Sequence, residues 1–229
     1  MIQKELITYS DEKTLLEGLY VSQTKEKASL VILCHAWRGR DSFIDQKAEW
    51  IASLGYRAFA LDLYGKGVLG QNPQENAKLK KPFLDDRKFL QRRLLAGYKK
   101  ALELSDTNIV VLGYGFGGVA ALDLARSGVP LKGAISVYGH FEEPNYPSKI
   151  QSKILLLHGY NDSVAPLKEL NEFEKRLSEQ KVDFQTHLFG NAYHAFATPG
   201  ASGPGIAYDE LCAKRAMKQI ELLLSEILA

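Results

Sequence analysis

The sequence predicts an α/β protein with a mostly parallel central sheet flanked by helices and an antiparallel hairpin at the N-terminus. Short, continuous apolar runs recur along the chain, as in strands that are buried on both faces of a parallel sheet. Segments with helical periodicity alternate with these runs, which is typical of a doubly wound sheet. The chain has 229 residues, of which 45% are hydrophobic and 24% charged, and this composition suits one domain with a sizeable core. We therefore expect residues 1–229 to form a single domain.

The expected strands follow from two patterns. Hydrophobic and polar residues alternate in segments 5–9 and 15–21, and the polar residues 10–13 between them indicate the turn of a hairpin. The continuous apolar runs predict buried strands over 29–34, 57–63, 108–112, 131–137 and 153–157. A more polar run, 183–189, predicts an edge strand.

Helical periodicity predicts helices over 45–54, 83–104, 119–127, 167–179 and 210–228. The cationic residues between 78 and 100 are interrupted by Asp85 and Asp86, which favours a solvated helix face. Segment 64–82 is the longest without a clear core pattern, and it follows a strand end, where open α/β sheets bind ligands. The segment is equally compatible with the rim of a pocket and with a surface loop that has no binding role.

Charge and cysteine content exclude several classes of protein. Lys and Arg total 29 against 27 Asp and Glu, so the composition gives no reason to expect a nucleic-acid or membrane partner. Cys34 lies in an expected strand and Cys212 in an expected helix, which argues against a disulfide framework. The first residues contain no apolar signal segment, and no apolar run approaches the length of a membrane span. We expect a cytoplasmic protein.

The most informative motif is Gly-Tyr-Gly-Phe-Gly-Gly at 113–118, between an expected strand and an expected helix. As G-x-G-x-x-G it matches the fingerprint of a dinucleotide-binding loop. As G-x-nucleophile-x-G it matches the nucleophile elbow of α/β-hydrolases, but Gly115 stands at the position of the nucleophile. The first interpretation predicts a nucleotide-binding oxidoreductase, and the second predicts a hydrolase fold without its attacking atom.

The dinucleotide interpretation lacks two expected features. The fingerprint should follow the first strand of its unit, whereas at least two parallel-type strands precede this motif. An acidic residue should also stand at the tip of the following strand, which here ends Ser136-Val137-Tyr138-Gly139-His140. An isolated glycine motif is therefore weak support for nucleotide binding.

The hydrolase interpretation gains two catalytic partners in the required chain order of nucleophile, acid and histidine. Asp162 follows the expected strand 153–157, and His194 follows the expected strand 183–189. In such a triad the imidazole takes the proton of the nucleophile, and the carboxylate holds the imidazole in the required tautomer. The oxyanion hole would use the backbone amides of Phe116, after the elbow, and of Trp37, after an earlier strand. The Trp37 side chain fits a pocket wall and an ordinary surface position equally well.

These segments together resemble the dienelactone hydrolase family, whose elbow is typically G-x-C-x-G-G. The matching segments are 34–39, 60–65, 113–118, 158–162 and 194–196, which span most of the chain. The resemblance implies an α/β-hydrolase fold and an esterase or lactonase acting on small, often carboxylate-bearing esters or enol-lactones, without a metal or a cofactor. It also implies arginines that bind the substrate carboxylate, for which Arg87 and Arg93 are the candidates. The departure is Gly115, which stands where the family has its cysteine.

Glycine has no side-chain atom that could attack a carbonyl, so no acyl-enzyme can form at position 115. We expect Cys34 to be a buried structural cysteine and Ser42 and Ser163 to be helix or turn caps, rather than substitute nucleophiles. A water molecule activated by His194 is a further hypothesis. Three classes follow: a hydrolase that lost its nucleophile, a natural pseudoenzyme that binds a small ester, acid or lactone, and a nucleotide-binding protein. The expected assembly is a monomer or a small homo-oligomer.

Overall fold

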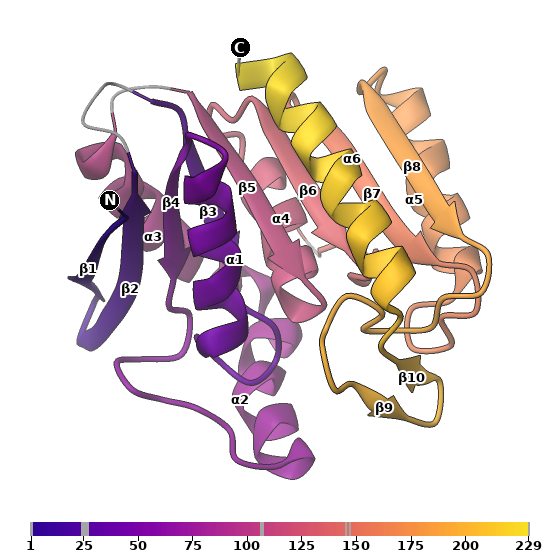
Figure 1. Cartoon of the computed structure of the whole chain (residues 1–229), viewed down its shortest axis with the longest axis horizontal. Helices are drawn as coiled ribbons and strands as arrows, with labels where there is room; N and C mark the ends of the chain where they lie inside the picture. The colour runs from indigo at the N-terminus through magenta and orange to yellow at the C-terminus, as the bar shows by residue number, and fades with distance from the viewer. Residues whose placement is uncertain (1, 24–27, 106–107, 145, 147, 229) are drawn as a thin grey trace.

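A computed structural model of the chain shows a central eight-stranded sheet between two layers of helices (Figure 1). It describes residues 2–23, 28–105, 108–144, 146 and 148–228. The sheet order is β1-β2-β4-β3-β5-β6-β7-β8, in which β1 and β2 are antiparallel neighbours and β3 to β8 are parallel. The strands are β1 Gln3–Asp11, β2 Thr14–Ser22, β3 Leu30–Cys34, β4 Arg57–Leu61, β5 Ile109–Tyr114, β6 Gly133–Val137, β7 Lys153–Gly159 and β8 Phe184–Phe189. The predicted fold class, with its N-terminal hairpin, is confirmed.

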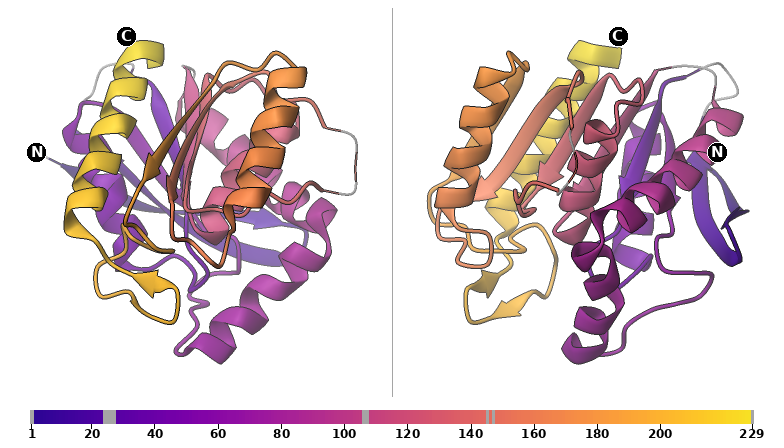
Figure 2. Two further views of the ribbon diagram at one scale, coloured as in Figure 1. Left: turned by 90° about the vertical axis from the view of Figure 1, so that its right-hand side faces the viewer. Right: turned by 180° about the vertical axis from the view of Figure 1, so that it is seen from behind.

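The helices divide between the two faces of the sheet (Figures 1 and 2). They are α1 Ser42–Ser53, α2 Pro73–Asp85, α3 Arg87–Leu104, α4 Phe116–Arg126, α5 Leu167–Glu179 and α6 Glu210–Leu228. Apolar residues of α1 and α6 form one core with strand residues such as Val31 and Leu33, and residues of α3, α4 and α5 form the other with Ile32. Alternate residues of one strand thus face opposite cores, which explains why the strand sequences are continuously apolar.

The predicted helix 83–104 is wrong at its start, because the structure has two helices in this region, α2 and α3, which meet at Asp86. Helix α2 also covers part of segment 64–82, for which no helix was predicted. Asn72 caps α2 by accepting a hydrogen bond from the Glu75 amide at 2.9 Å, and Pro73 occupies the first helical turn. Asp86 then separates the two helices and caps α3 through the amides of Lys88 and Phe89. The Asn-Pro pair with an acid three residues after the cap is a helix-start signal that the periodicity alone did not reveal.

Other boundaries differ by a few residues. Helix α1 begins at Ser42 and is capped by Asp41, so the prediction that Ser42 is a cap is wrong. Asp162, rather than Ser163, accepts the amides of the turn that follows β7. Helix α4 begins at Phe116, directly after the central glycine of the hexapeptide. A short hairpin that the sequence did not predict, β9 Ser202–Gly203 and β10 Ile206–Ala207, lies beyond the carboxyl ends of the strands (Figure 1).

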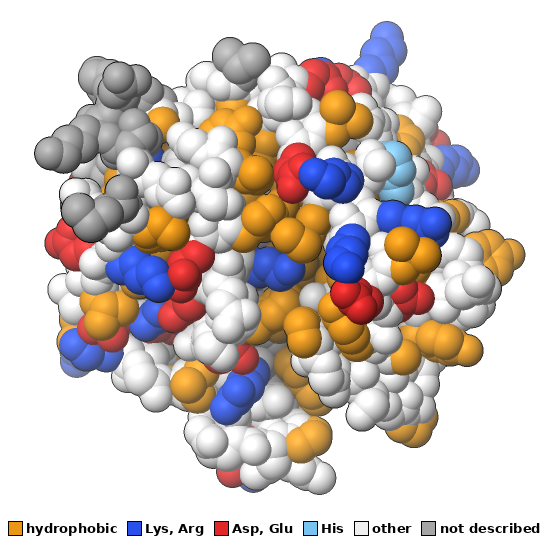
Figure 3. All heavy atoms as spheres, viewed as in Figure 1, with side chains coloured by type: hydrophobic (Ala, Val, Ile, Leu, Met, Phe, Trp, Pro, Cys, Tyr) orange, Lys and Arg blue, Asp and Glu red, His pale blue; other side chains and the backbone are white. Residues whose placement is uncertain are grey.

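On the face shown in Figure 3, basic and acidic side chains are interspersed among uncharged ones. Among the described residues, no helix is both long and apolar enough to cross a membrane.

Candidate active site

The hexapeptide forms a sharp turn between β5 and α4, at the centre of the sheet. Gly115 has φ 57° and ψ −115°, a conformation that side-chain-bearing residues adopt only under strain. Its amide donates to the Val137 carbonyl at 2.9 Å, and its own carbonyl accepts the Gly118 amide at 2.9 Å. A sharp turn with this conformation between a strand and a helix is what the nucleophile-elbow interpretation expects.

The glycines of this turn have different steric requirements. A Cβ atom at Gly113 would lie 1.8 Å from the Gly117 carbonyl oxygen, and one at Gly117 would lie 2.1 Å from the Cys34 carbonyl oxygen. A Cβ atom at Gly115 would meet only the Tyr138 ring, at 3.3 and 3.7 Å. Close packing of helix against strand therefore requires glycine at 113 and 117, whereas position 115 has room for a side chain.

Asp162 and His194 form a hydrogen-bonded pair at the ends of β7 and β8. The His194 Nδ1–H group donates to Asp162 Oδ2 at 2.8 Å, while Asp162 Oδ1 accepts the amides of Val164 and Ala165 at 2.9 and 2.8 Å. Burial alone would raise the pKa of Asp162, but the bonds from His194 and from the Ala165 amide outweigh it and hold the pKa below its ordinary value. Asp162 is thus an ionised orienting group for the imidazole.

Two loops hold this pair in place. Gly159 lies so close to the following loop that a Cβ atom would come within 2.5 Å of the Ala192 carbonyl oxygen, and the Asn161 amide donates to the same oxygen at 3.0 Å. The β9–β10 hairpin supports His194: the His194 amide donates to Gly205 and the Ala207 amide donates to the His194 carbonyl, each at 3.2 Å. The unpredicted hairpin therefore has a positioning role.

The two amides expected in an oxyanion hole are free of backbone acceptors within the described part of the chain. Phe116 is the first residue of α4, where an amide has no acceptor inside its own helix. Trp37 follows His35, whose Nδ1–H group donates to Ala36 at 2.7 Å and whose Nε2 accepts the Leu63 amide at 3.1 Å. Burial lowers the pKa of His35, so the ring is neutral. Its two hydrogen bonds hold the loop that carries the Trp37 amide in position.

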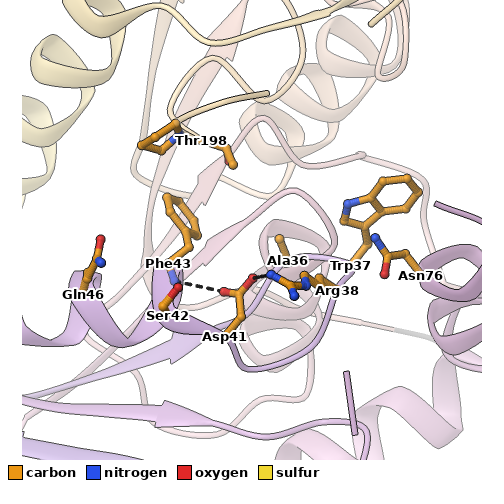
Figure 4. A pocket seen from close by; sticks show the side chains of 10 residues that line it. Ala36, Trp37, Arg38, Asp41, Ser42, Phe43, Gln46, Asn76 and Thr198 are labelled. Carbon is orange, nitrogen blue, oxygen red and sulfur yellow. Dashed lines mark hydrogen bonds and ion pairs between the residues drawn. The ribbon is translucent and has the colours of Figure 1, made fainter. Parts of the chain in front are cut away.

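A cavity of about 360 Å³ adjoins this loop (Figure 4). Trp37 and Asn76 lie together on one side of it, Phe43 and Gln46 on another, and Thr198 reaches it from the loop after β8. The Trp37 side chain lines this cavity and packs against the core. It therefore forms a pocket wall and is not an ordinary surface residue. Helix α2 contributes Asn76 and thereby belongs to the pocket rim.

An aromatic ring and a second histidine flank His194. The Tyr138 ring lies 5.3 Å from the His194 ring, edge to face, and its hydroxyl is 2.7 Å from the Thr198 hydroxyl. The His140 ring lies 6.2 Å from that of His194. Burial, with smaller contributions from His194 and Lys80, lowers the pKa of His140. A second imidazole, that of His140, therefore lies close to the imidazole of His194.

The arginines named from the resemblance are bound within the protein. Arg87 is buried and forms a two-bond ion pair with Asp123 at 2.6 Å, and Arg93 is buried against Asp11 at 2.8 Å. Both guanidinium groups therefore hold helix α3 to neighbouring elements. Neither is exposed to solvent, contrary to the expectation of a solvated helix face.

Cys34 is fully buried, and burial raises the pKa of its thiol, so it is unreactive. Cys212 is also buried, at the start of α6. Among the described residues, no group of three or more His, Cys, Asp or Glu side chains could hold a metal ion.

Several residues around the site were not found in the sequence. His140 was noted only because its strand end lacks an acid, and Thr198 carries no motif. Lys80 lies with its Nζ atom 5.4 Å from the Trp37 ring centroid. The only available signal was position, because His140 follows a buried parallel strand whose carboxyl end must face the site.

Comparison with known proteins agrees with this geometry. The sequence pattern of the Dienelactone hydrolase family matches residues 16–228. A carboxymethylenebutenolidase homolog of Xenopus tropicalis is 24% identical over 159 residues, which are 65% of this chain and 62% of that protein. The human homolog is 28% identical over 89 residues, which are 38% of this chain and 36% of that protein. The chain therefore matches less than two thirds of the length of these relatives.

Solved structures resemble the whole chain. The protein m3DLH superimposes with a TM-score of 0.94 at 24% identity, covering 100% of this chain and 99% of its own. A dienelactone hydrolase-like promiscuous phosphotriesterase from metagenomic libraries superimposes with a TM-score of 0.93 at 25% identity, with the same coverage. Because the family's sequence pattern matches residues 16–228, nearly the whole chain, the protein belongs to the dienelactone hydrolase family.

Proposed function

We propose that the chain has a dienelactone-hydrolase-type site for small carboxylic esters or lactones, in which Asp162 and His194 are the acid and base of a triad whose third position is Gly115. The observation that carries the proposal is the His194–Asp162 bond of 2.8 Å, together with the positive φ of Gly115 in the turn between β5 and α4. The backbone N–H groups of Phe116 and Trp37 would donate hydrogen bonds to the developing oxyanion. The site needs no metal and no cofactor for this chemistry.

Gly115 changes what such a site can do. Because no acyl group can be transferred to a glycine side chain, covalent catalysis at position 115 is absent. Loss of the nucleophile from a comparable triad reduces turnover by about 10⁶-fold, although the oxyanion hole and binding retain about 10³-fold catalysis over water. We therefore expect the chain to bind its ligand and to hydrolyse it very slowly or not at all.

Any residual hydrolysis would use a water molecule in place of the thiol. His194 Nε2 would take the proton of that water, the oxygen would attack the carbonyl, and the proton would pass to the leaving alkoxide. This route predicts that His194→Ala reduces the residual esterase rate. An unchanged rate would exclude His194 as the base.

The proposal is tested by restoring the nucleophile. The Gly115→Cys chain should hydrolyse a short-chain p-nitrophenyl ester and a simple enol-lactone up to about 10⁶-fold faster than the parent chain. Gly115→Ala is the matched control, because it adds the same Cβ atom without a thiol. If the cysteine variant is no faster than the alanine variant, the assignment of the elbow is wrong.

Two versions of this proposal differ only in the origin of Gly115. The chain is either a hydrolase that lost its nucleophile by mutation or a natural pseudoenzyme, and codon 115 in the source genome distinguishes them. The dinucleotide interpretation receives no support from the glycine contacts, since Gly113 and Gly117 are explained by packing against the elbow and β3. Saturable binding of NAD(P) would restore it.

A further inference from the structure

His158 is a buried histidine whose presence is not explained by packing alone. It lies in β7, with the core residues Ile154 and Leu156 two and four positions before it, and its side chain is fully buried. Its Nδ1 atom has no hydrogen-bond partner among the described residues. A buried polar atom without a partner is costly, and an apolar residue at this position would avoid that cost. The histidine therefore has to be explained by what its other nitrogen does.

The other nitrogen of the His158 ring bonds the backbone of Ala165. Nε2 lies 2.8 Å from the Ala165 carbonyl oxygen, and because a carbonyl only accepts, Nε2 must carry the hydrogen. Ala165 is fully buried and immediately precedes Pro166, the N-terminal cap of α5. Its carbonyl accepts no backbone amide within the described part of the chain. The His158 ring therefore supplies the donor that this buried carbonyl requires.

A chain of hydrogen bonds leads from His158 to His194. The Ala165 amide donates to Asp162 Oδ1 at 2.8 Å, beside the Val164 amide at 2.9 Å. Asp162 Oδ2 accepts Nδ1–H of His194 at 2.8 Å. One residue, Ala165, thus bonds His158 through its carbonyl and Asp162 through its amide. A movement of Ala165 would turn the carboxylate that binds His194.

His158 does not bond Asp162 directly. Its Nε2 atom lies 3.9 Å from Asp162 Oδ2, which is beyond hydrogen-bond distance. Burial lowers the pKa of His158, so the ring is neutral and adds no positive charge beside the carboxylate. The influence of His158 on Asp162 therefore passes through the turn formed by residues 162–165.

We propose that His158 is a positioning residue for the Asp162–His194 pair, because its bond to Ala165 holds the turn whose amides orient the carboxylate. The inference deepens the proposed function and rests on it, since this pair is the acid and base of the proposed site. Without the His158 donor, the Ala165 carbonyl turns toward another donor and the Ala165 amide leaves Asp162. His194 then loses the acceptor that fixes its Nδ1–H tautomer.

Nitrogen NMR spectra of the imidazole rings test the proposal without any reaction, since the chain has only five histidines. At a pH of about 8.5, above the ordinary histidine pKa of about 6.5, these spectra distinguish the Nδ1–H from the Nε2–H tautomer of a neutral ring. The unmodified chain should show His158 as the Nε2–H tautomer, and His194 and His35 as Nδ1–H tautomers. A His158 ring in the Nδ1–H form could not donate to Ala165 and would overturn the proposal.

Two amide variants separate the hydrogen bond of His158 from its packing. His158→Gln keeps a donor at the level of Nε2, whereas His158→Asn places it at the level of Nδ1, too far from Ala165. His158→Asn should therefore give a mixture of the two His194 tautomers, and His158→Gln should retain the Nδ1–H form. The His35 tautomer should not change in either variant, which reports that the fold is intact. An unchanged His194 tautomer in folded His158→Asn would contradict the proposal.

In the Gly115→Cys background the same variants give a kinetic readout. His158→Asn should lower kcat for a p-nitrophenyl ester by about 10- to 100-fold with KM nearly unchanged, because a displacement of about 1 Å in a catalytic group can cost about 100-fold. His158→Gln should restore most of this rate. His187→Asn is the matched control, since His187 is a half-buried histidine on the neighbouring strand β8, and it should change neither kcat nor KM.

The outcomes separate this inference from the proposed function. If the His194 tautomer responds to His158→Asn while Gly115→Cys is inactive, the positioning role is correct and the proposed function fails. If Gly115→Cys is active and His158→Asn changes neither the tautomer nor kcat, the proposed function stands and the positioning role is wrong. Equal losses in His158→Asn and His158→Gln would show that the ring contributes packing rather than a donor, and would also overturn the proposal.

Discussion

Three glycines of one short segment, Gly113, Gly115 and Gly117, have different physical reasons for being glycine. At 113 and 117 a methyl group would overlap a carbonyl oxygen, so packing forbids any other residue. At 115 the surroundings admit a side chain and only the positive φ disfavours it. The sequence predicts that Gly115 stands at the nucleophile position, and the structure shows that 115 is the one position of these three where a side chain fits.

This difference predicts the stability of alanine variants. Gly117→Ala should destabilise the chain by more than about 3 kcal/mol or prevent folding, because the clash is with backbone atoms that cannot move alone. Gly115→Ala should lower the free energy of unfolding by only about 1–2 kcal/mol, the strain of a positive φ. Chemical denaturation measures both values. Equal losses would show that packing, rather than backbone conformation, controls position 115.

At the same scale, Asp162 and His194 could be predicted from their order and their places after strands, because the ends of neighbouring parallel strands must meet at one edge of the sheet. His140 and Lys80 could not be assigned. Each is a single polar residue without a motif, and its proximity to His194 or Trp37 arises from tertiary packing.

At the scale of elements, helix α3 illustrates how a resemblance can misplace a role. Arg87 and Arg93 were candidates for binding a substrate carboxylate, yet each guanidinium is buried against an aspartate, Asp123 and Asp11 respectively. The sequence showed a basic helix but could not show which of its arginines have acidic partners distant in the chain. Helix α2 was missed because only two of its residues, Asn76 and Phe83, are buried, so the sequence shows little core pattern there.

The buried pair predicts a structural role for Arg87. In the Gly115→Cys background, Arg87→Met should destabilise the chain by about 3–5 kcal/mol, because Asp123 loses its main partner in the interior. The KM for a carboxylate-bearing ester should not change. Arg92→Met is the control, since the side chain of Arg92 is 47% exposed and its partner Asp11 keeps the buried Arg93. Loss of Arg92 should therefore cost less than about 1 kcal/mol. A large rise in KM with unchanged stability would instead support carboxylate binding by Arg87.

At the scale of the whole molecule, strand composition and the β-then-α rhythm were sufficient to predict a mostly parallel sheet between helices. The pocket could not be predicted, because its walls come from the loops after β3 and β8 and from helices α1 and α2, which are brought together only by long-range packing. The expected cytoplasmic location, the monomeric or small oligomeric assembly, the single domain and the absence of nucleic-acid partners stay predictions.

The buried histidines predict how overall stability varies with pH. Burial lowers the pKa of His35 and of His158 in the folded chain, so each binds a proton more readily when the chain is unfolded. The free energy of unfolding is therefore not reduced by these histidines above the ordinary histidine pKa of about 6.5. It falls as the pH drops below that value, because the unfolded chain then binds protons that the folded chain does not. Guanidinium unfolding at pH 7.5 and 5.5 should give a lower free energy of unfolding at pH 5.5, and His35→Asn should reduce this difference. Greater stability at pH 5.5 would contradict the neutral, buried state of these rings.

The central claim is that Gly115 occupies the nucleophile position of an otherwise assembled triad. The most direct measurement is the pre-steady-state reaction of the Gly115→Cys chain with a p-nitrophenyl ester, followed by mass spectrometric mapping of the acylated residue. A burst of one p-nitrophenolate per chain is expected, with the acyl group on Cys at position 115 and with no burst when His194 is also replaced by alanine. Absence of a burst in a folded variant, or acylation at Cys34 or Cys212 instead, would contradict the claim.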